Sequence, residues 1–350
     1  MSFTIVILTW TRDGWTLCLL ALEDIVTGFD SLFDRRKGKS HPTNWRKDYP
    51  ATFGALGSGL ADRPEIFDPA LKHYQRAFRK GEPVFSSPET ADAWRAARRE
   101  AMIHVVQVVA ASPWRDTLLL RGSLLLKAWL GLLAREPGDL DWVVTPQTRR
   151  ADEAETLKML RELTEAVVTQ PCSGSVRFHA DGVATDDIWL YDRAPGHRIV
   201  FPWTAPGLPS GMVQSDFVFN EKLWDAPERL NLRTSDDQLE WLWTASRAQS
   251  LAWKILWLES DSYPQGKDLY DAALLAEQTY LPLNLLKQAI ASAKEPPWRP
   301  ELSPDLPYRW AADWDSFKSE YPWVEGSLAD WQQRMSAALK RTFATPVTTQ

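Results

Sequence analysis

The residues with the clearest chemical potential in this sequence are two aspartates, Asp139 and Asp141, which begin an apolar run. Side chains alternate along a β-strand, so a strand here places both carboxylates on one face and Leu140 and Trp142 on the other. Two neighbouring carboxylates repel each other unless a cation lies between them. Hard oxygen ligands suit Mg²⁺ or Mn²⁺, so the pair predicts a divalent metal site.

A tight turn upstream of these aspartates has the residues needed to bind a phosphate. Thr117 to Leu120 is typical of a short strand, and Leu124 to Leu133 is typical of a buried helix. Between them, Gly122 allows a sharp backbone turn, and Ser123 can direct its hydroxyl and N–H at an anion over the helix start. We therefore predict a phosphate site next to the two aspartates.

A third aspartate follows a series of short strand-like runs that are separated by Gly, Asp and Pro turns. In the last run, Val213 to Asn220, alternation places Asp216 on the face opposite Phe217. Asp216 is therefore a candidate third carboxylate next to Asp139 and Asp141. Considered alone, an aspartate of a turn or a sheet edge is the simpler interpretation.

Two cations lie within a later apolar stretch, Leu239 to Leu258, which predicts a helix with Arg247 and Lys254 on its apolar side. An uncompensated ion in a protein interior costs on the order of several kcal/mol, so both cations need anions nearby. The alternative is a lysine whose ammonium group reaches the surface.

The segment that begins at Gly266 predicts a helix with acidic residues in its first turn. Asp268 and Asp271 share one helix face, and Lys267 reaches Asp271 four residues later. Either aspartate could hold Lys254 in place. The alternative is that these carboxylates only stabilise the helix dipole.

The Gly-Ser turn, the following helix and the Asp-x-Asp strand together resemble the nucleotidyltransferase superfamily, and in detail its AbiEii/AbiGii toxin family. Within that family the chain is similar to the mycobacterial tRNA-modifying toxins. Three later segments extend the similarity: VQSDFVFNEKL from Val213, the helix around Lys254, and GKDLYDAALLAE from Gly266. The resemblance covers roughly Leu118 to Gln278. The chain departs from it at Arg121, where many relatives have Gly, and at Pro137, where they have a hydroxyl residue.

The resemblance implies an α+β fold with a mixed-sheet core at residues 85–230 and a helical domain at 235–350, after an N-terminal extension at 1–84. It implies that a metal, Mg²⁺ or Mn²⁺, is bound by Asp139, Asp141 and Asp216. It implies that the active centre includes Lys254, Asp268 and Asp271. It implies that the nucleoside triphosphate (NTP) is contacted by Arg121, Gly122, Ser123, Arg135 and Lys267.

The activity implied is transfer of a nucleotide from an NTP to an RNA acceptor such as the 3′ end of a tRNA, by a toxin that is paired with a separately encoded antitoxin. One alternative is an acceptor that is a small molecule, such as an aminoglycoside, or a protein. The other is a non-catalytic nucleotide-binding module. A basic rim around the site favours RNA, whereas an acidic rim favours a cationic small molecule.

Composition is compatible with these expectations. The 350 residues carry 40 Lys and Arg against 46 Asp and Glu, so nucleic-acid binding needs a local basic patch. The segment Asp34 to Tyr49, with Arg76, Arg79 and Lys80, is a candidate, although a solvated charge run is the simpler interpretation. Cys18 and Cys172 have no metal-site spacing, which favours reduced thiols and the cytoplasm. We find no targeting or membrane-spanning segment.

Overall fold

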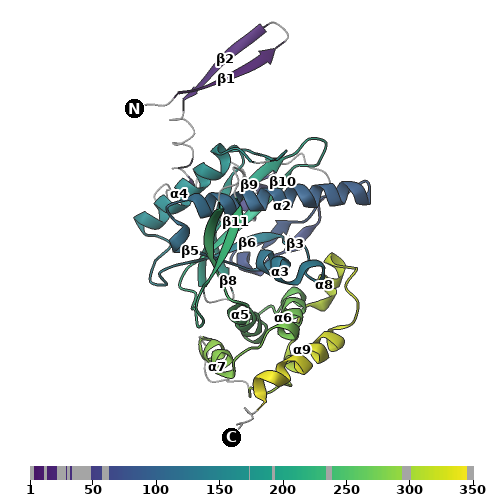
Figure 1. Ribbon diagram of the computed structural model, residues 1–350. Coiled ribbons are helices and arrows are strands. Elements are labelled where there is room, and N and C mark those ends of the chain that lie inside the picture. The colour runs from purple at the N-terminus through teal and green to yellow at the C-terminus, as the bar shows by residue number, and fades with distance from the viewer. Residues whose placement is uncertain are drawn as a thin grey trace.

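The chain folds into a mixed sheet followed by a group of helices (Figure 1). The computed structural model describes residues 4–11, 14–21, 29, 32–33, 49–56, 63–172, 174–190, 194–233, 239–293 and 301–344. The predicted basic segment Asp34 to Tyr49 therefore lies almost entirely outside the described residues. Within the described part, no helix is long and apolar enough to cross a membrane.

The central sheet has eight described strands in the order β11-β12-β5-β6-β10-β9-β7, with β8 paired to β9. Their bounds are β5 Leu118–Arg121, β6 Asp139–Val144, β7 Arg177–Phe178, β8 Ala184–Leu190, β9 Ala194–Thr204, β10 Gly211–Val218, β11 Glu228–Arg233 and β12 Leu239–Thr244. Strand β10 runs parallel to β6, and β12 runs parallel to β5, while the other neighbours are antiparallel. The predicted α+β fold with a mixed sheet is confirmed.

Helices cover both faces of this sheet. Helix α2 (Pro88–Ala111) and helix α4 (Ala154–Thr169) pack on one face, where the strands contribute Leu118, Leu120, Leu140 and Trp142. On the other face, Leu119 and Val143 pack with α3 (Ser123–Leu130) and the C-terminal helices. Because side chains alternate along β6, Asp139 and Asp141 leave the sheet on this second face, as predicted.

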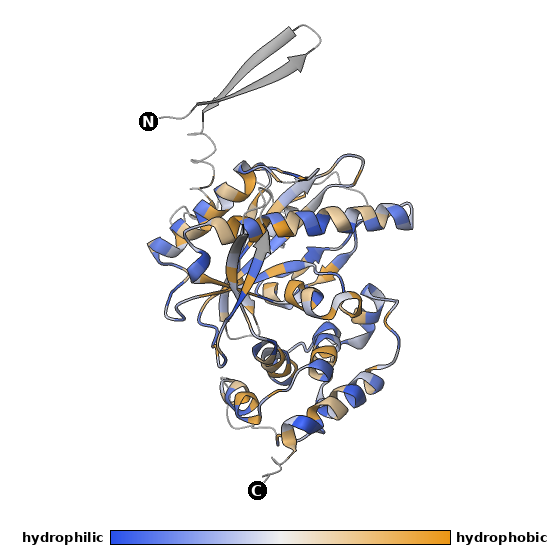
Figure 2. Ribbon diagram, in the orientation of Figure 1, coloured by the Kyte–Doolittle hydropathy of each residue, from blue (hydrophilic) through white to orange (hydrophobic). Residues whose placement is uncertain are grey.

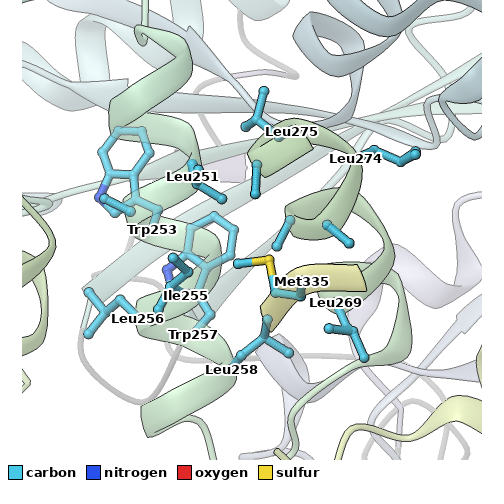
Figure 3. Close-up of a cluster of buried hydrophobic side chains, with 14 of the residues drawn as sticks. Leu251, Trp253, Ile255, Leu256, Trp257, Leu258, Leu269, Leu274, Leu275 and Met335 are labelled. Atoms are coloured by element: carbon cyan, nitrogen blue, oxygen red, sulfur yellow. The ribbon is translucent and has the colours of Figure 1, made fainter. Parts of the chain in front are cut away.

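The C-terminal helices form a second core. They are α5 Arg247–Ser260, α6 Gly266–Gln278, α7 Leu283–Ala291, α8 Trp314–Glu320 and α9 Leu328–Phe343. Figure 3 shows how Leu251 and Leu258 of α5, Leu269 and Leu275 of α6 and Met335 of α9 meet in one cluster. Helix α9 mixes hydrophobic and hydrophilic residues along its length (Figure 2), which is expected of a helix that buries one face.

The prediction of a single helix from Leu239 to Leu258 was wrong over its first part. Residues Leu239–Thr244 form β12, which pairs with β11 and β5, and α5 begins only at Arg247, after the Ser246 cap. Leu242 faces the sheet core, whereas Trp243 is half-buried, so this part follows a period of two. The sheet thus extends past residue 235, and the helical part starts at Arg247.

The described part of the N-terminal segment contacts the sheet through residues next to its second hairpin. It contains two hairpins, β1 (Thr4–Thr11) with β2 (Gly14–Ala21) and β3 (Glu65–Phe67) with β4 (Phe78–Lys80). Next to the second hairpin, Tyr74 donates a hydrogen bond of 2.8 Å to Asp186 on β8. Residues 65–80 therefore lie next to the sheet that contains Asp139 and Asp141.

His104 is buried in α2. Its Nε2 atom lies 3.1 Å from the Val167 carbonyl oxygen, and its ring stacks on Phe178. Burial lowers the pKa of His104. These contacts explain the burial of His104 without a bound metal ion.

Candidate active site

Asp139 and Asp141 line a polar pocket between the sheet and the C-terminal helices. Nine of the eleven site residues predicted from the sequence line it: Gly122, Ser123, Arg135, Asp139, Asp141, Asp216, Lys254, Lys267 and Asp268. Residues from five separate segments thus meet at one place. The two others, Arg121 and Asp271, lie behind its wall.

The two β6 carboxylates have opposite electrostatic environments. Burial and the charge of Asp139 raise the pKa of Asp141 to about 7. Burial would raise the pKa of Asp139 as well, but the nearby cations Lys267 and Arg135 outweigh it and lower that pKa. At neutral pH the pair therefore carries between one and two negative charges in a buried site, which is an environment that attracts a cation.

The Gly122-Ser123 turn is fitted closely to these carboxylates. Gly122 has a φ of 85° and stands so close to β6 that a Cβ atom would overlap the Asp141 carboxylate. Ser123 begins α3, and its hydroxyl donates a hydrogen bond of 3.4 Å to Asp139. The turn thus brings a hydroxyl and the start of a helix to the site where a phosphate was predicted.

We expect Gly122→Ala to disrupt this site, because the added methyl group displaces Asp141 and an alanine resists positive φ. The strain costs about 1–2 kcal/mol, and transfer activity should fall at least tenfold. Thermal unfolding and a transfer assay measure both effects. Gly138→Ala is the matched control, because a Cβ there meets nothing within 4 Å. Equal activity in both variants would contradict the proposed fit.

Lys254 is held by two aspartates of α6. Its ammonium group donates to Asp268 at 2.6 Å and to Asp271 at 3.0 Å, and the residue is only 5% exposed. Burial would lower the pKa of Lys254, but the two carboxylates raise it. The surface-lysine alternative is therefore wrong. Arg247, expected on the same side, instead lies over the Trp129 ring at 5.5 Å.

Arg135 completes this charged group. Its guanidinium donates to both oxygens of Asp271, at 3.2 and 3.0 Å. Asp271 therefore binds two cations that line the pocket, although it does not line the pocket itself. Lys267, at the start of α6, has no ion-pair partner within the described residues, so its charge is available to a ligand.

Arg121 is the correction among the predicted nucleotide contacts. The residue is 1% exposed, donates to Glu221 at 3.1 Å, and lies against the rings of Trp253 and Trp257. In this chain the arginine thus attaches β5 to α5. Its side chain points into the core because alternation places it with Leu119, on the face of β5 that packs against the C-terminal helices.

Asp216 is placed beside Asp141, because β10 and β6 are parallel and these two residues are in register. Both Asp216 oxygens already accept hydrogen bonds of 2.8 Å from Arg198. Burial raises the pKa of Asp216 while Arg198 lowers it, and two short bonds to a guanidinium, which is always charged, favour the ionised form. Asp139 and Asp141 fit a metal, but no set of three metal-binding side chains exists among the described residues.

Three pocket residues were missed by the sequence analysis as members of the site. Asp68 accepts a hydrogen bond of 2.7 Å from Arg198, and Arg79 of β4 pairs with Glu320 of α8 at 3.2 Å. Arg79 was predicted only as part of a basic patch that could contact nucleic acid. No local pattern marks Asp68 or Arg198 as a site residue, because their roles depend on strand pairing. The one usable signal was that Arg198 lies in a strand-like run next to that of Asp216.

A broad groove of about 1170 Å³ opens beside Asp139. Its lining carries both signs of charge, including the predicted Arg79 and Lys80 as well as Glu82 and Glu136. Three of its aromatic residues are about half exposed: Phe67, Tyr263 and Trp323. The charge of the rim alone therefore does not select the acceptor, but the groove offers flat apolar surfaces.

Comparison with known families gives one match. The family model described as nucleotidyl transferase AbiEii toxin, type IV TA system, matches residues 104–337. The match covers more than half of the chain and includes the Gly-Ser turn, all three strand aspartates and Lys254. A search of curated proteins finds no match.

Proposed function

Because this chain belongs to the AbiEii family of nucleotidyl transferase toxins, we propose that it transfers a nucleotide from an NTP to an RNA acceptor in a metal-dependent reaction. The resemblance stated from the sequence is confirmed, and so is the enzyme class, a nucleotidyltransferase. The family belongs to type IV toxin-antitoxin systems, so a separate antitoxin is the expected partner. The metal, the NTP and the RNA are the proposed parts.

The observation that carries the proposal is the carboxylate pair facing a group of cations. Asp139 and Asp141 would hold Mg²⁺, which when bound supplies positive charge to the triphosphate. Neither carboxylate has an ion pair of its own among the described residues, and burial together with the charge of Asp139 raises the pKa of Asp141 to about 7. A divalent ion relieves that repulsion.

The remaining residues provide positions for the phosphates and the acceptor. Ser123 can donate its hydroxyl and N–H to a phosphate oxygen, and Lys267 can neutralise a second one. Lys254, fixed by Asp268 and Asp271, holds a charge at the pocket wall where the negative charge of the transition state develops. The acceptor hydroxyl attacks the α-phosphorus, and pyrophosphate leaves.

The groove supports RNA as the acceptor. Single-stranded nucleic acids bind through cationic side chains and through aromatic rings on which bases stack. Here Phe67 and Tyr263 contact each other edge to face at 5.4 Å and are both exposed, and Arg79 and Lys80 lie on the same hairpin as Phe67. An unpaired end such as the 3′ end of a tRNA suits such a groove better than a duplex does.

The test is incubation of the purified chain with each α-labelled NTP and total RNA. We expect one NTP to label RNA of tRNA size and EDTA to abolish the labelling, with Asp139→Asn as the catalytic control. Label in a cationic small molecule or in protein would replace RNA as the acceptor. If no NTP gives a labelled product with any acceptor, the transfer proposal fails.

A further inference from the structure

We propose that Asp216 is a positioning residue for Arg198 and not a metal ligand, and that Arg198 supplies the second positive charge of the active site. The inference rests on the proposed function, since it concerns metal-dependent nucleotidyl transfer. Two-metal enzymes stabilise the attacking and leaving oxygens with two cations. In this chain, one of those cations would be a guanidinium group.

Strand pairing places Arg198 at the reacting centre. Asp141 of β6 is in register with Asp216 of β10, and Asp216 is in register with Arg198 of β9. The three side chains therefore form one row across three neighbouring strands, on the face that carries the pocket. Arg198 and both aspartates line that pocket.

The contacts of Arg198 are those of a fixed group. Its Nε and Nη2 atoms donate to the two oxygens of Asp216, each at 2.8 Å, and its Nη1 atom donates to Asp68 at 2.7 Å. Asp68 is fixed in turn, because its other oxygen accepts from the Ala70 N–H at 3.1 Å. A guanidinium has five N–H donors, so these three bonds leave two for a ligand. Arg198 is 2% exposed, so its orientation is determined by these carboxylates.

The three strand aspartates of the site therefore differ in their partners. Asp216 has its carboxylate matched by a bidentate arginine, the strongest geometry available to such a pair. Asp139 accepts one long hydrogen bond from Ser123, and no ion pair to Asp139 or Asp141 occurs in the described part of the chain. A metal bound by Asp139 and Asp141 breaks no ion pair, whereas a metal on Asp216 would compete with Arg198 for the same carboxylate. The geometry points to one metal ion and one arginine.

Counting bound metal in the wild-type chain tests this directly. Mn²⁺ is titrated into the full chain in the presence of a non-hydrolysable NTP analogue, and protein-bound Mn²⁺ is measured by electron paramagnetic resonance. We expect one protein-bound Mn²⁺ per chain in total, counting any ion that the bound analogue shares with the protein. Two per chain would overturn the inference. No bound Mn²⁺ would overturn the proposed function and the inference with it.

Variants locate the metal independently of turnover. Asp216→Asn should keep Mn²⁺ affinity within about threefold but lower kcat about 10²-fold with little change in KM, because the arginine loses its charged anchor. Arg198→Lys keeps the positive charge of the folded site. It should likewise preserve Mn²⁺ affinity and lower kcat. Asp139→Asn should instead lower Mn²⁺ affinity at least about tenfold.

Asp187→Asn is the matched control, because this aspartate lies on β8 of the same sheet, with its side chain 58% exposed, and pairs with His197 outside the pocket. It should change neither Mn²⁺ binding nor kcat. If Asp216→Asn loses Mn²⁺ to the extent that Asp139→Asn does, Asp216 is a metal ligand and the inference is wrong. If Arg198→Lys keeps full kcat, the arginine has no part in the reaction.

Discussion

Replacing Asp139 or Asp141 with asparagine is expected to abolish nucleotidyl transfer, with a loss in kcat of at least about 10³-fold. Asparagine keeps the shape of aspartate but removes the charge that holds a divalent ion. At position 139 it can also keep the hydrogen bond from Ser123, which is 3.4 Å long in the wild-type structure. The loss should therefore appear as lost metal binding and not as unfolding.

Stability should be unchanged or slightly higher in Asp141→Asn. Burial and Asp139 raise the pKa of Asp141 to about 7, well above the ordinary value of 3.8. Between these two values the folded chain binds more protons than the unfolded chain, so this group lowers the free energy of unfolding as pH rises from about 4 to about 7. At pH 8 without metal, the asparagine variant should therefore have a free energy of unfolding equal to or slightly higher than that of the wild type.

The measurements are product formation from a labelled NTP, Mn²⁺ affinity, and thermal unfolding with and without metal. Asp181→Asn is the control, since that residue is exposed and outside the pocket. Its activity and metal affinity should equal those of the wild type. Transfer that persists in Asp139→Asn or in Asp141→Asn would mean that the two-carboxylate site is wrong.

Replacing Lys254 with methionine is expected to lower kcat by about 10²-fold or more, the scale seen when one charge-stabilising group is removed from a preorganised site. It should also destabilise the fold by about 3–5 kcal/mol, because removing one partner of a buried ion pair leaves a charge uncompensated. Asp268 bears most of this effect, since Asp271 keeps its two bonds from Arg135. Chemical denaturation and single-turnover kinetics measure the two effects separately.

A double variant separates catalysis from folding. Lys254→Met combined with Asp268→Asn removes the buried charge together with its partner, so much of the stability should return. Activity should not return, because the cation at the pocket wall is still missing. Lys158→Met, a change at a lysine whose side chain is 60% exposed on α4, is the matched control and should alter neither property. Near-normal transfer by Lys254→Met would mean that the lysine is only structural.

The sequence alone determined the features that depend on local periodicity. Alternation along a strand was sufficient to place Asp139 and Asp141 on one face, and the Gly122-Ser123 turn was identified from residue types whose conformational preferences act over a few residues. The family resemblance drew on these same short motifs.

Tertiary structure alone decided which distant residues meet. The contact of Arg198 with Asp68 joins residues 130 positions apart, and its contact with Asp216 depends on the register of two strands, which no local pattern specifies. Strand pairing likewise converted Leu239–Thr244 from predicted helix to β12, because an apolar run is compatible with either structure until it has a partner. Burial against Trp253 and Trp257 turned Arg121 from an expected nucleotide contact into part of the core. In each case the local sequence permits several outcomes, and packing between distant segments selects one.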